Sequence, residues 1–283
     1  MREIYYTTEV TMFLRKKMIV VLALFIAVAS SCFCDIRLAS ETIALLDELM
    51  DLKIELYSYK SPADSLNVLG KWESKIQNQY DSLGEVDQMV LTNMIDCEKY
   101  NYKIQISGTK KELNTLLSAQ AKKCKKFYDE HKNEKMDAWV PLSCGSAIAV
   151  YMALEPLKTA FSYGYPTRDM FQKAVDIDPN FSHALRNLAQ WYYYCPGFLG
   201  GSKKKAKELF NKAYNTSQCK DDKFENSILL SQLAFDDDDN AKRDKYMAEA
   251  RSYSAKSSYL DFVDRINASG ESVFKYHGHK ADE

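Results

Sequence analysis

The chain has 283 residues, a formal net charge of −1 and a hydrophobic content of 46%. This composition is typical of a chain that buries a continuous core, and the near-neutral charge argues against a basic surface that binds nucleic acid. Because there are only 10 glycines and 6 prolines, the sequence is too poor in turn residues for a β-sandwich or barrel. We therefore expect an all-α protein.

The first 34 residues have the pattern of an export signal. Basic residues at 15–17 precede an apolar run at 18–29, which ends in small residues at 29–31. This order is typical of a secretory signal. The apolar run is also shorter than the ~20 residues that a permanent membrane helix needs. We expect residues 1–34 to be a signal peptide and the protein to be exported to the periplasm or held at the membrane.

Cys32 offers a route to membrane anchoring. It follows Ala29-Ser30-Ser31, which resembles a loose bacterial lipobox. In that interpretation Cys32 becomes the acylated first residue of the mature protein. The alternative is simple cleavage between Ala29 and Asp35, and Ala29 favours it because a lipobox usually has leucine or a similar aliphatic residue there. Any contact with the membrane is expected only through such a lipid anchor.

The remaining chain carries no motif for a metal or cofactor. No CxxC pair and no Cys/His group at metal-ligand spacing occurs, so we predict no metal, no cofactor and no fixed disulfide pairing. His277 and His279 could hold a metal, but a histidine pair in a flexible tail is usually incidental. The acidic run 236–239 lacks the glycine and the final glutamate of a calcium loop. The cysteines beyond the signal are Cys97, Cys124, Cys144, Cys195 and Cys219.

The region 35–136 is predicted to form helical hairpins. Apolar residues recur at helical spacing from 40 to 59, from 62 to about 80, from 84 to 106 and from 109 to 127. Ser61-Pro62 is a strong helix start, since proline fits the first helical position and serine can precede it as a cap. Only period and order support hairpins here, so an unrelated helical bundle remains the alternative for this region.

Helices continue through 137–269. The next helix is expected to begin near Asp137, to be interrupted at Pro156 and to end at Gly164-Tyr165-Pro166, after which Thr167 caps another. Weaker helical patterns cover 224–250, a capping helix covers 259–266, and 270–283 is expected to be a flexible tail.

Residues 171–213 contain a spacing that identifies the kind of helix pair. Apolar and small residues close one unit before Pro179, open a second unit and, after a short insertion, close it. The residues that carry this pattern are Phe171, Ala174, Pro179, Leu185, Leu188, Ala189, Tyr192, Ala206, Phe210 and Ala213.

This segment resembles the tetratricopeptide repeat (TPR) proteins of bacterial envelopes. Pro196-Gly197 followed by Gly200-Gly201 is similar to a P-G-x-x-G-G insertion in a group of exported repeat proteins, where it lengthens the turn within one unit. The resemblance implies a right-handed α-solenoid of about five helix pairs plus a capping helix.

The same resemblance implies a binding function. In such repeats the first helix of each unit lines the concave face, which here places His183, Arg186, Asn187, Gln190 and Tyr194 toward a partner. We expect a non-catalytic scaffold or adaptor that binds a protein or peptide, because no G-x-S-x-G, H-E-x-x-H or paired Cys/His nucleophile is present. The alternative is a repeat-protein accessory of a TRAP-type transporter that binds a small organic ligand.

Overall fold

A computed structural model describes residues 35–282. The expected signal peptide, with Cys32, lies outside the described residues. Helices α2 to α13 belong to one unit, which comprises residues 37–132 and 136–283, and the other described residues belong to a second unit. Within the described range, no helix has both the length and the apolar character needed to cross a bilayer.

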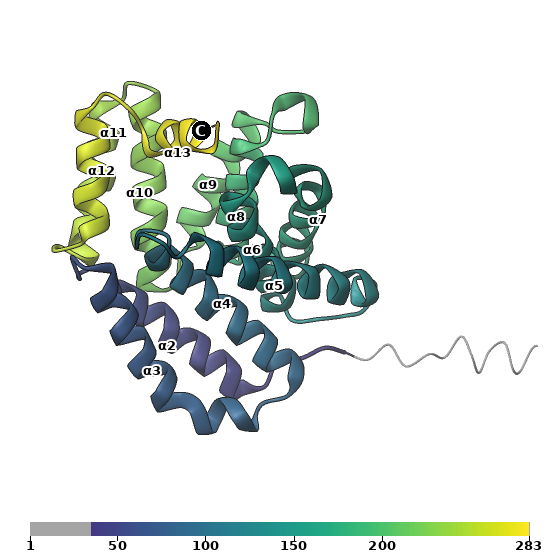
Figure 1. Ribbon diagram of the computed structural model, residues 1–283. Coiled ribbons are helices and arrows are strands. Elements are labelled where there is room, and N and C mark those ends of the chain that lie inside the picture. The colour runs from purple at the N-terminus through teal and green to yellow at the C-terminus, as the bar shows by residue number, and fades with distance from the viewer. Residues whose placement is uncertain (1–34, 283) are drawn as a thin grey trace, which may run out of the picture. The chain divides into compact units, whose positions relative to one another are not determined.

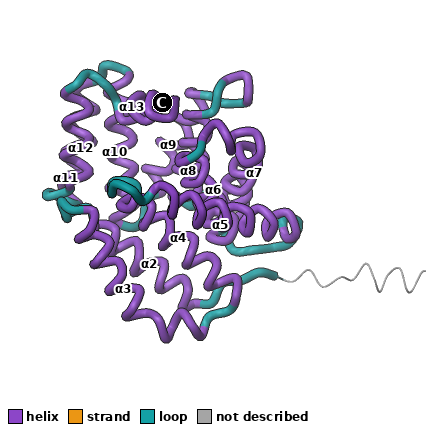
Figure 2. Tube along the Cα trace, viewed as in Figure 1, coloured by secondary structure: helices purple, strands orange, loops and turns teal. Residues whose placement is uncertain are grey.

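Every regular element of the described chain is a helix, so the predicted all-α class is confirmed (Figure 2). Figure 1 shows α2, α3 and α4 grouped together, and these three helices pack on one another. The helices are α2 (Ser40–Leu56), α3 (Pro62–Ser82), α4 (Glu85–Lys103), α5 (Lys110–His131), α6 (Trp139–Leu154), α7 (Pro156–Ile177), α8 (Ser182–Tyr194), α9 (Lys203–Thr216), α10 (Lys220–Asp236), α11 (Asn240–Tyr253), α12 (Ser258–Ala268) and α13 (Val273–Asp282), with a short 3₁₀ helix η1 (Gly197–Leu199) between α8 and α9.

Local sequence signals fix several of these boundaries. Pro62 is the first residue of α3 and Pro156 the first of α7, positions where the missing proline N–H costs nothing. The Ser202 side chain accepts a hydrogen bond of 3.2 Å from the Lys205 N–H and so caps α9.

Consecutive helices pair in the second half of the chain. α6 packs on α7, α8 on α9 and α10 on α11.

The insertion between α8 and α9 requires glycine at both position 200 and position 201. Gly200 has φ of 93°, and a Cβ on Gly201 would lie 1.7 Å from the Cys195 carbonyl oxygen. The Pro196–Gly201 turn is therefore closed by backbone contacts that only glycine permits.

The predicted helix break at Gly164-Tyr165-Pro166 is wrong. The predicted interruption at Pro156 is confirmed, because α6 ends at Leu154 and α7 begins at Pro156. α7 then runs to Ile177 with Pro166 and Thr167 inside it, so the prediction that Thr167 caps a helix is also wrong. An internal proline usually costs about 3 kcal/mol or more. The helix nevertheless continues because Met170 and other apolar residues of α7 pack on α6. The Trp191 indole N–H also donates to the Gly164 carbonyl at 2.8 Å and so ties α7 to α8.

Seven of the ten repeat-signature residues share one apolar cluster, which we call the hairpin core. Pro179 is exposed at the turn before α8, and Leu185 and Ala213 are fully buried outside the cluster. The remaining signature residues all belong to it. The buried members of the hairpin core are Leu142, Phe171, Ala174, Ala184, Leu188, Ala189, Tyr192, Tyr193, Ala206, Phe210, Leu230, Leu233 and Phe274.

The expectation of a flexible tail at 270–283 is wrong for Val273 and Phe274. Residues 273–282 form α13, and Phe274 is only 3% exposed. Its ring stacks on Tyr193 with centroids 4.2 Å apart and lies 5.6 Å from Phe210. Burial of an aromatic side chain in the hairpin core stabilises the last helix against the entropy of a free chain end.

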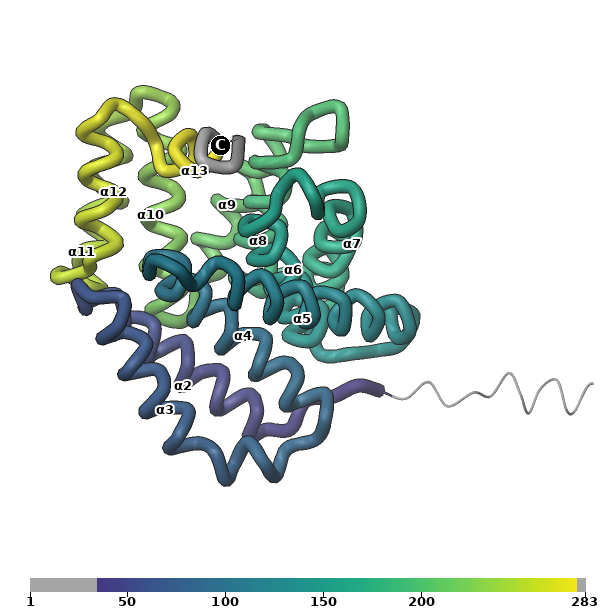
Figure 3. Tube along the Cα trace, in the orientation of Figure 1, coloured from purple at the N-terminus to yellow at the C-terminus, as the bar shows by residue number. Residues whose placement is uncertain are grey.

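The first helix also packs on the last ones, which an open array of neighbours does not predict. α2 packs on α10, and the Tyr57 carbonyl accepts a 2.8 Å hydrogen bond from the Ser258 N–H at the start of α12. The Tyr57 ring stacks on Phe224 with centroids 5.0 Å apart. Figure 3 shows the end of α2 beside the start of α12. The helix pairs are thus tied together by contacts between distant parts of the sequence.

Candidate functional site

The structure separates the five residues that were predicted to line a partner groove on α8. His183 and Arg186 are 5% and 4% exposed, so the prediction that they face a partner is wrong. Asn187 and Gln190 are half-buried, and Tyr194 is 44% exposed. The physical reason is that α8 is covered on the His183 side by the start of α10.

Arg186 belongs to a buried ionic network that we call the charge seam. Its Nη1 donates to Asp222 Oδ1 at 2.9 Å, its Nε lies 3.1 Å from Glu225 Oε2, and its Nη2 lies 3.8 Å from Asp221 Oδ2. The members of the charge seam are Lys53, Glu98, Arg186, Asp221, Asp222 and Glu225.

Lys53 extends the charge seam from α2 to α4 and α10. Its Nζ lies 3.0 Å from Asp221 Oδ2, 3.0 Å from Glu225 Oε1 and 3.4 Å from Glu98 Oε1. The Tyr57 hydroxyl also donates to Glu225 Oε1 at 2.7 Å. The seam therefore connects four helices that are far apart in the sequence.

The charge seam contains four carboxyl groups but only two permanent cations. The pKa shifts of the carboxyl groups show which of them resist ionisation. Burial raises the pKa of Asp221 to about 7, against the opposing attraction of Lys53. Burial also raises the pKa of Glu98. Burial acts in the same direction on Glu225, but Arg186 and Lys53 outweigh it and hold the pKa of Glu225 well below its usual range.

Some buried oxygens of this region have no hydrogen-bond partner among the described residues. They are Glu98 Oε2, Asp221 Oδ1 and the Tyr102 hydroxyl. Buried polar atoms in folded proteins are nearly always paired, because an unpaired one loses its hydration without compensation. The two carboxylate oxygens among them, Glu98 Oε2 and Asp221 Oδ1, are therefore acceptors that no donor of the described residues satisfies.

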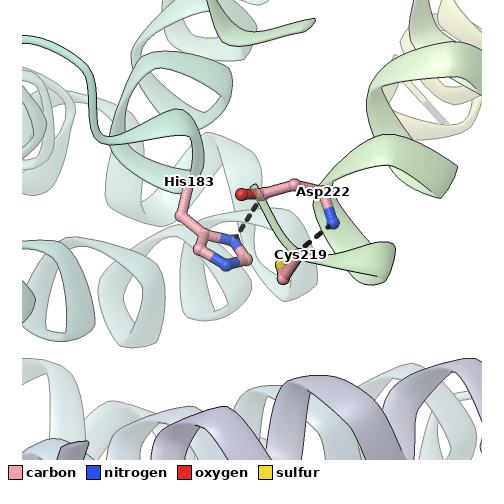
Figure 4. A group of neighbouring side chains, drawn as sticks. All are labelled: His183, Cys219 and Asp222. Atoms are coloured by element: carbon pink, nitrogen blue, oxygen red, sulfur yellow. Dashed lines mark hydrogen bonds and ion pairs between the residues drawn. The ribbon is translucent and has the colours of Figure 1, made fainter. Parts of the chain in front are cut away.

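One corner of the charge seam groups three different metal-ligand types. His183, Cys219 and Asp222 each offer a donor atom, and these atoms lie within 4.8 Å of one another. Figure 4 shows the imidazole of His183 beside the Asp222 carboxylate, at 3.1 Å, with the Cys219 sulfur next to them. Cys219 is the N-cap of α10, and its sulfur accepts from the Asp222 N–H at 3.4 Å.

The same trio has the residue types of a cysteine nucleophile with a histidine base. A reactive cysteine needs a lowered pKa, because the thiolate is the nucleophile. Here burial, with the nearby Asp222 charge, raises the pKa of Cys219 to about 11, so the thiol stays protonated at neutral pH. Burial also lowers the pKa of His183 to about 4. A neutral imidazole and a protonated thiol give this arrangement little nucleophilic character.

A second feature is one side of α7, which we call the α7 face: the exposed residues Leu157, Phe161 and Tyr165, followed by the half-buried Arg168. Their spacing of one residue per helical turn places them on one side of the helix. Leu157 and Phe161 are 89% and 91% exposed, and Tyr165 is 46% exposed. Isolated exposed apolar residues are normal, but a contiguous stripe marks an interaction surface.

The end of the α7 face is held in place by stacking. The Arg168 guanidinium lies 5.1 Å from the centre of the Tyr165 ring and 5.5 Å from that of Trp191. Such cation–π contacts and the indole hydrogen bond to Gly164 restrict the rotamers of these side chains. The surface is thus pre-organised at one end and apolar at the other.

An open groove between α3 and α4 is smaller than most ligand sites. Its volume is about 210 Å³, below the roughly 300–1,000 Å³ of typical small-molecule pockets. It is lined by Glu73, Ile76, Gln77, Tyr80, Thr92, Ile95, Asp96 and Lys99.

Comparison of the chain with protein-family models, with curated proteins and with solved structures gave no match.

Proposed function

We propose that this protein is a non-catalytic helical scaffold that binds a protein or peptide partner at the cell envelope, with the α7 face as its docking surface. The observation that carries this proposal is the near-complete exposure of Leu157 and Phe161 on successive turns of one helix. Burying a side chain of this size gains roughly 1.5–3 kcal/mol relative to leaving it in water. A partner that covers both residues therefore has a substantial driving force.

The chemistry of the α7 face favours an amphipathic helix as its partner. Leu157, Phe161 and Tyr165 form a straight ridge with one anchor per turn, which fits between the apolar side chains of a second helix. Lys158 is exposed beside the ridge. An acidic residue at the margin of the partner's apolar stripe would complement it.

We infer that α6–α11 are TPR-type hairpins. This inference is supported by their pairing in chain order and by the burial of Phe171, Leu188 and Phe210 in the hairpin core. Because His183 and Arg186 are buried, the proposed docking surface is the α7 face rather than the first helix of the signature unit.

The envelope location rests on the basic and apolar pattern of residues 1–34. Acylation of Cys32 would anchor the mature protein, whereas simple cleavage would release it. Growth with a labelled fatty acid distinguishes the two, because label on wild type but not on Cys32→Ser requires the lipid. The transporter-accessory alternative needs a ligand cavity, and the groove between α3 and α4, at about 210 Å³, is smaller than typical ligand pockets.

The docking surface is tested by site-specific photo-crosslinking in native cells. We expect benzoylphenylalanine at position 161 to give one adduct of discrete mass, and the same probe at the exposed position Lys122 on α5 to give none. The adduct at 161 should disappear when Leu157→Ser is added. Equal adducts at both positions, no adduct at either, or an adduct of twice the chain's own mass would reject a separate partner at the α7 face.

A further inference from the structure

The geometry of His183, Cys219 and Asp222 is close to that of a bound metal ion. Tetrahedral zinc holds nitrogen and oxygen at about 2.0–2.2 Å and sulfur at about 2.3 Å, so its ligand atoms stand roughly 3.3–3.7 Å apart. The His183 nitrogen and Asp222 oxygen are 3.1 Å apart, and the Cys219 sulfur lies within 4.8 Å of both. Small side-chain movements would bring the three donors to one centre.

The donors are held by rigid elements rather than by loops. His183 lies in the first turn of α8, Cys219 caps α10, and Asp222 follows in the first turn of the same helix. Cys219 is half-buried, whereas the other two are buried, so an ion would reach the site from the cysteine side. Donors fixed on helices lose little entropy when they bind an ion.

An independent observation shows that this region can accept positive charge. Asp221 is fully buried next to the trio, and its Oδ1 has no partner in the described part of the chain. The carboxylates of the charge seam also outnumber Lys53 and Arg186. A divalent cation bound by the Cys219 thiolate would reduce the net negative charge of this interior.

Arg186 holds the position that competes with such an ion. Its Nη1 donates to Asp222 Oδ1 at 2.9 Å, and its Nη2 lies 2.9 Å from His183 Nδ1. Glu225 Oε2 lies 3.1 Å from the Nε of Arg186, and Asp221 Oδ2 lies 3.8 Å from its Nη2, so the guanidinium would keep carboxylate partners if an ion displaced it from Asp222.

We propose that His183, Cys219 and Asp222 form a binding site for a zinc-like divalent transition metal ion, and that Arg186 occupies the site in competition with the ion. Histidine nitrogen, cysteine sulfur and aspartate oxygen together suit Zn²⁺ rather than Mg²⁺ or Ca²⁺, which prefer oxygen ligands only. On binding, a metal–sulfur bond forms and the thiol proton passes to water.

The test is titration of the full, reduced chain with Co²⁺ and Zn²⁺. We expect one equivalent of Co²⁺ to produce a thiolate-to-cobalt charge-transfer band, which Zn²⁺ then removes. Cys219→Ser should abolish the band and weaken Zn²⁺ binding roughly 100-fold, because a thiolate ligand is lost. Serine is a good N-cap, so this variant keeps the start of α10. The matched control, Cys195→Ser, removes another half-buried thiol and should bind as wild type does.

Arg186→Gln tests the competition separately and should strengthen Zn²⁺ binding by roughly tenfold if the variant folds. The comparison of Cys219→Ser with Cys195→Ser tests the metal site without the Arg186 variant. A charge-transfer band that persists in Cys219→Ser would assign the metal to other groups. Failure of wild type to bind one equivalent of either ion, or equal loss in both cysteine variants, would also overturn the proposal.

Discussion

The hairpin core and the charge seam meet at α8 and α10, but they hold helices together in opposite ways. The hairpin core joins neighbours in the sequence through apolar contacts, as in the packing of Leu188 and Phe210 between α8 and α9. The charge seam joins α2 and α4 to α8 and α10 through ions, and Lys53 and Asp221 are 168 positions apart. Both regions are buried, but only the hairpin core follows from a local pattern in the sequence.

The two regions should also respond differently to change. Apolar contacts are non-directional, so a core tolerates swaps that keep its volume. A buried ion pair depends on geometry, and loss of one partner leaves the other charged and without water. The charge seam is therefore the more brittle of the two junctions.

The largest effect is expected from Lys53→Met. The substitution keeps a similar volume but removes the cation that pairs with Glu98 and leaves Asp221 and Glu225 with Arg186 alone, so we expect a loss of about 3–5 kcal/mol in the free energy of unfolding. Urea denaturation measures it. Lys75→Met is the control, because this lysine side chain is 74% exposed, and it should change stability by less than about 0.5 kcal/mol. Equal stability of the two variants would show that the seam adds nothing.

Leu188→Ala tests the hairpin core. Leu188 is 1% exposed, so its truncation should leave a cavity and cost about 3 kcal/mol, within the usual range for buried leucine. Leu157→Ala on the α7 face provides a matched control, and we expect less than about 0.5 kcal/mol there. Thermal unfolding followed by circular dichroism compares them. A cost at Leu157 as large as that at Leu188 would mean that the α7 face is covered in solution by part of the chain itself.

The smallest effect, of opposite sign, is expected from Glu98→Gln. Burial raises the pKa of Glu98 above its model-peptide value, so its contribution to stability is complete below about pH 4.5 and is lost as the pH rises through the folded-state pKa. The amide avoids burying a charge. In this variant Lys53 still has Asp221 and Glu225 as ion-pair partners. Burial raises the pKa values of Tyr102 and Cys97 near Glu98, so both groups stay protonated at neutral pH.

We therefore expect Glu98→Gln to gain on the order of 1 kcal/mol over wild type near pH 8, and less near pH 5. Urea denaturation at the two pH values measures the difference. A variant that is less stable than wild type at pH 8, by an amount that does not change with pH, would show that the Lys53–Glu98 attraction outweighs the burial of the carboxylate.

The helix pattern could be predicted from the sequence where the signals were local. Ser61-Pro62 and Pro156 mark helix starts, and the glycines after Pro196 mark the insertion, because capping and turn chemistry act within a few residues. The same local reasoning failed at Pro166 and at Phe274. Packing of α7 on α6 outweighed the proline, and the aromatic cluster around Tyr193 ordered the end of the chain.

The candidate sites were harder to predict for a related reason. His183 and Arg186 look like exposed polar residues of an amphipathic helix, and nothing nearby in the sequence shows that α10 covers them. His183 and Cys219 come from different helices, so they have no metal-ligand spacing. The acids Asp221, Asp222 and Glu225 near the start of a helix that continues with 228–230 and 233–235 as apolar runs were the available signal, since charges on a buried helix require buried partners.

By itself, the sequence determined that the described chain is helical and where most helices begin, because periodicity, caps and turn residues act through neighbouring atoms. Only the tertiary structure decided that α2 returns to α10, that the His183 and Arg186 side of α8 is interior, and that Leu157 and Phe161 on successive turns of α7 are left in water. These outcomes depend on which surfaces meet across long sequence separations. The free energy of burying a charge or an apolar group depends on its partners, and these partners cannot be predicted from a local sequence pattern.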